Sequence, residues 1–403
     1  MVSWMWYYMS TNNFRICMVT SQALPILHPF AATIRFINTR KILNERNNRM
    51  IQISKNTKLS GERDYVDGFV TYKVPSVNIR WIRQIFFMFL LLPTLIKVVK
   101  KEKPDILFVN SIFCTPSLYL LKKISERKLI VHYDVMGISY KETLIEPPSK
   151  LAGLLQSLLY TILDKIMLKT ADIITTINET HKDILKRQTS KPIYVIRDGI
   201  NLGNFVNANK KFAHIKKGDN GIFLMFVGSL AHKRLDALFS VIPQVIKKVP
   251  TLKLVIVGDG MDQKYYQQKA ENLGLLNKKI FFTGHVDNDK LPSYLPLADI
   301  CFSDVWSNIG FPMKVFEYMA MGKAMIVKDT TGVHEILENG ENAYLYKNEK
   351  DLFEKIILLA KNKGLRENLG MKAKELVLKE HTWDYRGNQL MDIYRINLRR
   401  TNS

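Results

Sequence analysis

Short apolar runs alternate with helical patterns along almost the whole chain, and this alternation strongly limits the possible folds. Runs such as 106–110, 173–177 and 222–227 have the length of buried strands, and the stretches between them are long enough for crossover helices. Strands that alternate with helices form parallel sheets with helices on both faces. The 403 residues, 47% of them apolar, are too many for one core and sufficient for two. We therefore predict an α/β protein with two doubly wound domains facing a central cleft.

A polar and basic segment without apolar periodicity divides the chain at residues 206–221. We predict an N-terminal domain over residues 1–205, a linker over 206–221, a C-terminal domain over 222–380, and a final amphipathic helix within 381–403. The first ten residues lack the basic start and the long apolar stretch of a signal peptide. We expect them to be disordered or to precede a true start at Met9.

The net charge of +22 lies mainly in the first part of the chain. Residues 1–100 hold 14 Lys or Arg against 4 Asp or Glu, whereas residues 251–350 hold 11 against 13. Such a basic surface attracts nucleic acid or anionic lipid. Aromatic residues interleaved on a basic sheet would favour nucleic acid, but here they cluster in apolar strands and one helix. We therefore expect no nucleic acid partner and favour an anionic membrane surface.

The uncharged run 84–96 lies next to this basic charge. It is shorter than the roughly 20 apolar residues that cross a bilayer. With its flanking Lys and Arg residues it suits a helix in the membrane interface, and a buried helix that covers a sheet explains it equally well. We expect no transmembrane helix elsewhere. Three widely spaced cysteines exclude a disulfide framework and fit a reducing cytosol.

Glycines follow three apolar runs of the second half, at the strand ends where doubly wound domains bind ligands. Gly228 and Ser229 follow the first run, and Lys233 and Arg234 follow in the same loop before a helix. A helix N-terminus with adjacent cations binds phosphate, although a solvated basic pair is the simpler alternative. The next two runs are followed by Gly258 and by the pair Gly284 and Val286.

The segment Gly310-Phe-Pro-Met-Lys-Val-Phe-Glu317 combines a Gly-Phe-Pro turn with one acid in an otherwise apolar helix. The start of such a helix presents backbone N–H groups and a positive dipole end, which suit a diphosphate. Glu317, about one turn into the helix, can accept hydrogen bonds from ligand hydroxyl groups. An ordinary amphipathic helix with a solvated glutamate is the alternative when the segment is taken alone.

In their order, these segments resemble the retaining glycosyltransferases of family 4, which have the GT-B fold. The resemblance rests on Val227-Gly-Ser-Leu with Lys233-Arg, on Leu254-Val-Ile-Val-Gly-Asp-Gly, on Phe282-Thr-Gly-His-Val, and on residues 310–327. It covers nearly the whole chain, strongly from residue 171 to 346 and weakly before residue 100, and it implies that the final helix, within 381–403, returns to the N-terminal domain. It implies transfer of a sugar from a UDP- or GDP-linked donor with retention of configuration, without a metal or a cofactor.

The resemblance also implies roles for single residues. Glu317 would hold the nucleotide ribose, and Lys233, with Arg234 as a second cation, would neutralise the leaving diphosphate. His132, with Asp134 as a second candidate, would lie near the donor sugar; a histidine satisfied at a strand end is the alternative. The remaining donor-binding positions are Gly228, Ser229, Gly258, Gly284, Val286, Ile309, Gly310, Phe311, Pro312, Met313, Lys314 and Val315.

Two departures from the family pattern concern the donor. Many members have two glutamates eight positions apart, and here the first of these positions is Ile309, which cannot accept a hydrogen bond. Gly228-Ser229 stands where many members have Gly-Arg, so one phosphate-binding cation is missing. Both departures affect the choice of donor sugar more than the type of reaction.

These observations predict a metal-independent hexosyltransferase-like enzyme, peripheral on the cytosolic face of a membrane. We expect its acceptor to be a lipid-linked oligosaccharide or a surface polysaccharide precursor. A nucleotide-sugar epimerase of the same fold is the alternative, and a basic nucleic-acid-binding protein with an inactive sugar site ranks last.

Overall fold

The computed structural model describes residues 13–24, 31–56, 63–76, 82–138, 150–203, 220–287, 290–304 and 311–402. The chain forms two compact units, Met1–Arg197 with Arg386–Ser403, and Asp198–Tyr385. The first unit thus ends before the expected boundary at residue 205 and takes in most of the final helix. The first ten residues and nearly all of the expected linker lie outside the described residues.

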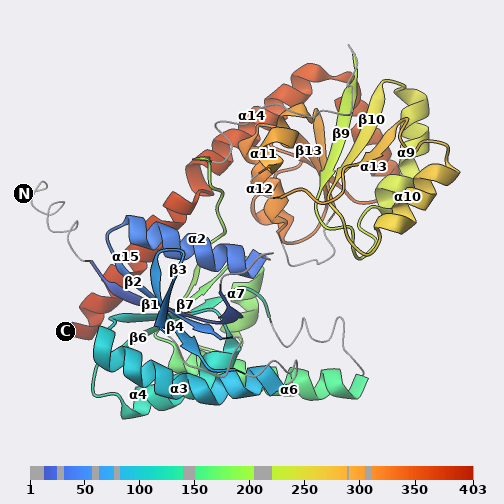
Figure 1. Cartoon of the computed structure of the whole chain (residues 1–403). Coiled ribbons are helices and arrows are strands. Elements are labelled where there is room, and N and C mark those ends of the chain that lie inside the picture. The colour runs from blue at the N-terminus through green and yellow to red at the C-terminus, as the bar shows by residue number, and fades with distance from the viewer. Residues whose placement is uncertain are drawn as a thin grey trace, which may run out of the picture. The chain divides into compact units, whose positions relative to one another are not determined.

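An eight-stranded sheet forms the centre of the first unit, in the order β3-β4-β2-β1-β5-β6-β7-β8 (Figure 1). Only the edge strand β3 is antiparallel to its neighbour. The sequence did not predict β3 because three of its four side chains are exposed and form no apolar run. The strands are β1 Arg15–Ala23, β2 Arg49–Lys55, β3 Arg63–Val66, β4 Phe69–Val74, β5 Ile106–Val109, β6 Ile130–Val135, β7 Ile173–Thr176 and β8 Ile193–Val195.

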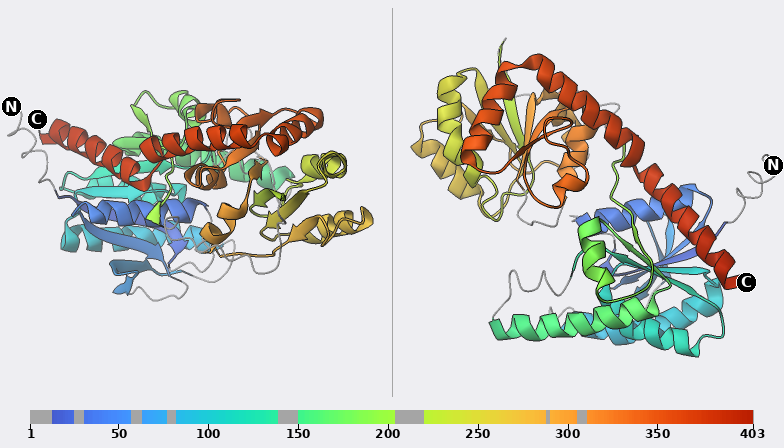
Figure 2. Two further views of the ribbon diagram at one scale, coloured as in Figure 1. Left: turned by 90° about the horizontal axis from the view of Figure 1, so that it is seen from above. Right: turned by 180° about the vertical axis from the view of Figure 1, so that it is seen from behind.

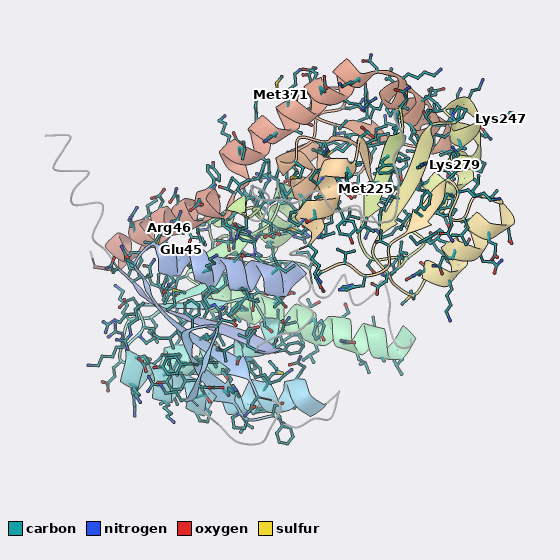
Figure 3. The ribbon with its side chains drawn as sticks, turned by 45° about the horizontal axis from the view of Figure 1, so that its top comes forward. Glu45, Arg46, Met225, Lys247, Lys279 and Met371 are labelled. Atoms are coloured by element: carbon teal, nitrogen blue, oxygen red, sulfur yellow. The ribbon has the colours of Figure 1, made fainter. Side chains whose placement is uncertain are left out.

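Helices lie on both faces of this sheet (Figures 1 and 2). One face is covered by α3 Ile82–Glu102, α4 Thr115–Ile124 and α6 Lys150–Thr170, whose apolar side chains share a core with the strands. The other face carries α2 Ala31–Glu45 and α15 Trp383–Asn402, while the short α7 Glu179–Lys186 follows β7. Just past α2, Arg46, which is labelled in Figure 3, donates hydrogen bonds from Nε and Nη2 to Oδ1 of Asn388 on α15. The last helix is thus fastened to the first unit.

The second unit is built on six parallel strands in the order β11-β10-β9-β12-β13-β14. These are β9 Ile222–Val227, β10 Leu252–Val257, β11 Ile280–Phe282, β12 Ile300–Ser303, β13 Ala324–Lys328 and β14 Tyr344–Tyr346. Their apolar runs are buried on both faces, as parallel strands require; Met225 in β9 is fully buried, whereas Lys247 is exposed and Lys279 is half-buried.

Two helical layers cover the sheet of the second unit. One core contains α9 Asp236–Lys248, α10 Gln263–Asn272 and α13 Glu349–Lys361, and the other contains α11 Leu291–Tyr294, α12 Met313–Ala320 and part of α14 Lys363–Glu380. The prediction of two doubly wound, Rossmann-like α/β domains is confirmed. In the second unit the strand order reverses between β9 and β12, and ligands of such sheets bind at the carboxyl ends of the strands at this point.

Candidate donor-binding site

Tyr318 of α12 is hydrogen-bonded to both strands at the switch point between β9 and β12. The Tyr318 hydroxyl accepts a hydrogen bond from the N–H of Val227 at 3.0 Å and lies 3.4 Å from the carbonyl oxygen of Phe302, to which it donates. Tyr318 is fully buried, and burial raises its pKa well above the ordinary value, so the hydroxyl stays protonated. This contact fixes α12 against the ends of the two strands where the sheet divides.

A pocket of about 210 Å³ lies at the carboxyl ends of β9, β10 and β11. Three loops that each follow a strand form most of its wall, and α11 and α12 complete it. Of the predicted donor-binding residues, Gly228, Ser229, Gly258, Val286 and Lys314 line it. The other lining residues are Val227, Val257, Asp259, His285 and Leu291.

The loops of this pocket touch through their backbones at Gly258. Its N–H donates to the carbonyl oxygen of Gly284 at 3.0 Å, and a Cβ atom at Gly258 would lie only 2.0 Å from the carbonyl oxygen of Gly228. Its φ of 133° is also one that other residues rarely adopt. A glycine is therefore required where the three loops meet. Gly228 and Gly258 have no side chains, so their backbone atoms form part of the pocket wall.

Glu317 lies in α12 with its carboxyl group largely buried; the side chain is 20% exposed. Its Oε1 atom accepts a hydrogen bond from Lys314 Nζ at 2.8 Å, whereas Oε2 has no partner among the described residues. Burial raises the pKa of this carboxyl group, and the positive charge of Lys314 opposes that rise. Since Lys314 also lines the pocket, it links the acid to the pocket wall.

Two cations flank the site, and they are not the pair that the sequence suggested. The guanidinium of Arg234 is close to Gly228 and donates from Nε and Nη2 to the carbonyl oxygen of Asp304, at 3.2 and 2.8 Å. Lys233 instead lies with Nζ 3.4 Å from Asp262 and over the ring of Tyr265, and it is not a pocket-lining residue. Lys314 therefore lines the pocket, and Arg234 lies beside the lining residue Gly228.

The rest of the predicted segment is described only from Phe311 onward. Ile309 and Gly310 lie outside the described residues. Phe311 packs on Phe316 with ring centroids 4.7 Å apart. Pro312 caps α12 without a side-chain hydrogen bond, and its carbonyl oxygen accepts from the N–H of Val315, a buried residue, at 2.9 Å; Met313 begins the helix. The helix thus starts at this turn, as predicted.

His132 and Asp134 require a correction, because the structure places both inside the core of the first unit. His132 is fully buried, with Nδ1 2.8 Å from the Tyr394 hydroxyl and Nε2 2.8 Å from Oγ1 of Thr175. Asp134 is 1% exposed and ion-paired with Arg35 and Arg386. Neither side chain has a surface that a donor sugar can contact. Both belong to a buried polar network that joins β6, β7, α2 and α15.

Two of the lining residues that were not predicted as part of the site are ionisable, Asp259 and His285. Nδ1 of His285 lies 3.5 Å from Asp259, and Nε2 lies 3.5 Å from Asp287. Both residues stand next to a strand-end glycine, so their places in the chain could have indicated their position. Within the described ranges, no group of three His, Cys, Asp or Glu residues lies close enough to hold a metal ion.

One helix in the described part of the chain, Leu151–Thr170, is long and apolar enough to cross a membrane by length and composition. This helix was not singled out from the sequence, because only the run 84–96 was considered. The buried side chains Leu163, Met167 and Leu168 belong to the core shared with the sheet, and Asp164 accepts a hydrogen bond from the Tyr133 hydroxyl at 2.8 Å. The helix is therefore packed on the first unit along one face.

Comparison with known proteins agrees with this geometry. One family model, glycosyltransferase family 4, matches residues 53–204, and a second, glycosyl transferases group 1, matches residues 207–376. An uncharacterized glycosyltransferase of Methanocaldococcus jannaschii is 24% identical over 324 residues, which are 77% of this chain and 78% of the relative.

Two further matches cover different shares of the chain. The phosphatidyl-myo-inositol mannosyltransferase of Mycobacterium tuberculosis is 24% identical over 205 residues, 49% of this chain and 53% of that protein. Among solved structures, Anabaena HepE in complex with UDP-glucose is similar with a TM-score of 0.68 and 13% identity, over 95% of this chain and 100% of that chain. At this identity, the structural match bears on the fold alone.

Proposed function

We propose that this chain belongs to the glycosyltransferases of family 4 and transfers a sugar from a UDP- or GDP-linked donor to a glycan acceptor with retention of configuration. The observation that carries the proposal is Glu317, a largely buried acid with one oxygen unbonded, whose other oxygen is paired with Lys314 of the pocket wall. A buried carboxylate without its full set of hydrogen bonds is costly, and ribose hydroxyl groups would supply the missing donors. A nucleotide-sugar complex of a structural neighbour supports this class of ligand.

The described cations suit departure of a nucleoside diphosphate. Breaking the bond between the sugar and the β-phosphate leaves negative charge on the phosphate oxygens, and fixed positive groups stabilise this charge. Lys314 lines the pocket, Arg234 lies beside the lining residue Gly228, and the first turn of α12 presents its positive dipole end nearby. We propose that these groups take the place of a metal ion.

Release of the free nucleoside diphosphate tests the proposal. With a purified donor and a membrane extract as acceptor, we expect UDP or GDP to accumulate with transfer of the sugar to the lipid fraction. A retaining enzyme gives a product with the anomeric configuration of the donor, which NMR spectroscopy of the glycan determines. Conversion of the donor into an epimeric nucleotide-sugar, with no free UDP or GDP and no glycosylated product, would contradict glycosyl transfer and favour the epimerase alternative, which acts on the donor without an acceptor.

We further propose a lipid-linked glycan or a surface polysaccharide precursor as acceptor, at the cytosolic face of a membrane. The support comes from α6, where an exposed apolar stripe repeats every three or four residues: Leu151, Leu154, Leu155, Leu158, Leu159 and Ile162. The α3 helix adds Ile85, Phe86 and Phe89, but Phe87, which the uncharged run also contains, is buried. The helices α3 and α6 contain one acid each, Glu102 and Asp164, and both are buried. The charged side chains at the surface of these helices are therefore all basic.

Replacing Leu154, Leu155 and Leu158 by serine should weaken binding to anionic vesicles by about 10²-fold. Each leucine removed from the lipid interface is expected to cost about 1 kcal/mol. Co-sedimentation with vesicles of phosphatidylglycerol and phosphatidylcholine measures the effect. Met371→Ser, which changes an equally exposed apolar residue of α14, is the matched control and should bind like the wild type. Equal binding of the triple variant would exclude α6 as the attachment surface.

A further inference from the structure

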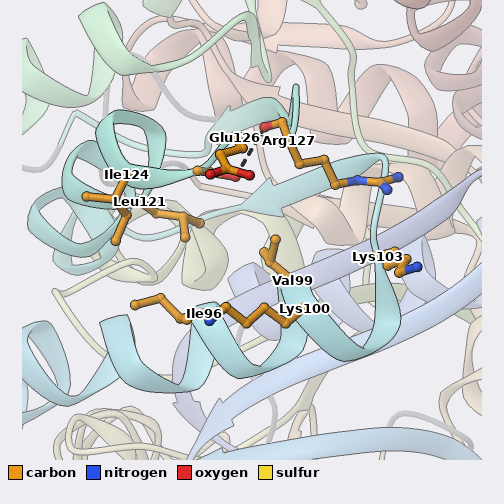
Figure 4. Close-up of a pocket in the computed structure, with 9 residues that line it drawn as sticks. Ile96, Val99, Lys100, Lys103, Leu121, Ile124, Glu126 and Arg127 are labelled. Carbon is orange, nitrogen blue, oxygen red and sulfur yellow. Dashed lines mark hydrogen bonds between the residues drawn. The ribbon is translucent and has the colours of Figure 1, made fainter.

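A second cleft, of about 650 Å³, lies between α3 and α4 in the first unit (Figure 4). It is formed by the last turns of α3 and α4 and by residues that follow α4. Since α3 leads into β5 and α4 into β6, the cleft lies at the edge where these strands begin. Doubly wound sheets bind substrates at the opposite edge, so this cleft is not an expected substrate site. Its volume is nonetheless that of a small-molecule site.

The floor of the cleft is apolar. Val99 and Leu121 are buried at its base, Ile96 is half-buried, and Ile124, 58% exposed, stands at its rim. In Figure 4 the side chains of Ile96 and Val99 face those of Leu121 and Ile124 across the opening. An exposed isoleucine above an apolar floor suits a hydrocarbon chain rather than a small hydrophilic molecule.

The rim of the cleft is basic. Lys100 and Lys103 line it, and the ammonium group of neither forms a hydrogen bond or an ion pair with another described residue. Arg127 is already bonded to Asp105, at 2.9 Å, and to the carbonyl oxygen of Pro104. Glu126 is the one acid among the lining residues. Residues 96–128 hold eight basic against three acidic residues, so the surroundings carry an uncompensated positive charge that favours an anionic group.

Lys103 occupies a position that favours glycine. Its φ is 50°, and its N–H donates to the carbonyl oxygen of Val99. This is the geometry of a helix that ends with one residue in the left-handed conformation. Glycine adopts this conformation without the steric cost that a side chain brings. The chain therefore carries a lysine at the cleft where glycine would make a more stable helix end, which indicates a role for the charge.

We propose that this cleft binds one anionic phospholipid. Lys100 and Lys103 hold the phosphate of the head group, and the first part of an acyl chain lies on Ile96, Val99 and Leu121. The inference rests on the proposed location at a membrane, but not on the donor pocket. A free phosphate would leave the apolar floor empty, and a lipid without net charge would leave the two lysines uncompensated.

Binding of monomeric dihexanoylphosphatidylglycerol, measured by calorimetry on the full chain, tests the proposal. We expect binding at least ten times tighter than that of dihexanoylphosphatidylcholine or of inorganic phosphate. Lys100→Gln and Lys103→Gly should each weaken it about five-fold, the effect of one lysine at an anionic lipid surface. Lys101→Gln, which changes an exposed lysine of the same helix outside the cleft, should leave it unchanged. Lys103→Gly should also raise the melting temperature, so weaker binding there is not unfolding.

Two results would overturn the lipid site. In the first, Lys100→Gln binds the lipid as tightly as Lys101→Gln. In the second, inorganic phosphate displaces the lipid at equal concentration, which would make the cleft a general anion site. Thermal shifts with UDP- and GDP-sugars are measured on the same samples. Lipid binding without any donor binding would reject the proposed function and keep the lipid site, and donor binding without lipid binding would do the reverse.

Discussion

Replacing Asp134 by alanine is expected to lower the free energy of unfolding by about 3–5 kcal/mol, the cost of removing one partner from a buried ion pair. Asp134 Oδ2 accepts from Arg35 Nε at 2.8 Å and from Arg386 Nη2 at 3.3 Å, while Oδ1 accepts from Arg35 Nη2 at 2.8 Å and from Thr175 at 2.6 Å. All three charged side chains are about 1% exposed. Without the carboxylate, two guanidinium groups remain in the core without this counter-charge.

Urea-induced unfolding at neutral pH, followed by circular dichroism, measures this loss. Asp64→Ala is the matched control, because Asp64 also forms an ion pair, with Lys73 at 2.7 Å, but lies at the surface, where such pairs contribute little. A loss as small for Asp134→Ala as for Asp64→Ala would mean that the network does not stabilise the first unit.

The same network should make the protein sensitive to acid. Burial lowers the pKa of His132 to about 3, far below the roughly 6.5 of an unfolded histidine. The folded state then binds fewer protons than the unfolded state between these values, so stability falls with falling pH, by up to about 1.4 kcal/mol per unit. Asp134 adds to this loss at lower pH: burial opposes its ionisation, but Arg35 and Arg386 hold its pKa well below the ordinary value. His132→Gln should flatten the dependence between pH 6.5 and 4.

The network also shows where prediction from sequence was limited. The strand-end glycines and the start of α12 were predictable, because a loop that follows an apolar run is a local pattern. The burial of Asp134 depends instead on Arg35 and Arg386, which lie about 100 and 250 residues away in the chain. No local pattern around a strand residue reveals such partners. The buried residues His132 and Asp134 were therefore interpreted as catalytic residues.

Other differences between the sequence prediction and the structure could have been anticipated from the sequence. Lys314 precedes Glu317 by three positions, the spacing at which helical side chains meet, and their ion pair could have been predicted. The apolar stripe of α6 likewise repeats at helical spacing, but its exposure depends on which face the sheet covers. Lys233 was placed at the pocket because its loop follows β9; its positive φ of 54° and its contacts with Asp262 and Tyr265 direct its side chain elsewhere.

Glu317→Ala should weaken donor binding by about 10³-fold. If the carboxylate accepts hydrogen bonds from both ribose hydroxyl groups, each contributes about 2 kcal/mol as a bond to a charged group, and their loss corresponds to roughly this factor. Calorimetric titration with UDP- and GDP-sugars measures the change. Glu367→Ala, which removes a glutamate that is also paired with a lysine of its own helix, is the control and should bind the donor like the wild type.

The stability of this variant separates binding from folding. Glu317 is a largely buried acid whose pKa burial raises and whose Oε2 atom is unbonded, so the unliganded protein gains little from it. We therefore expect Glu317→Ala to melt at the temperature of the wild type or above it, while the stabilisation that a donor gives the wild type disappears. A residue kept for packing would show the opposite, a lower melting temperature with unchanged donor affinity. That outcome would remove Glu317 from the donor site and, with it, the observation on which the proposed function rests.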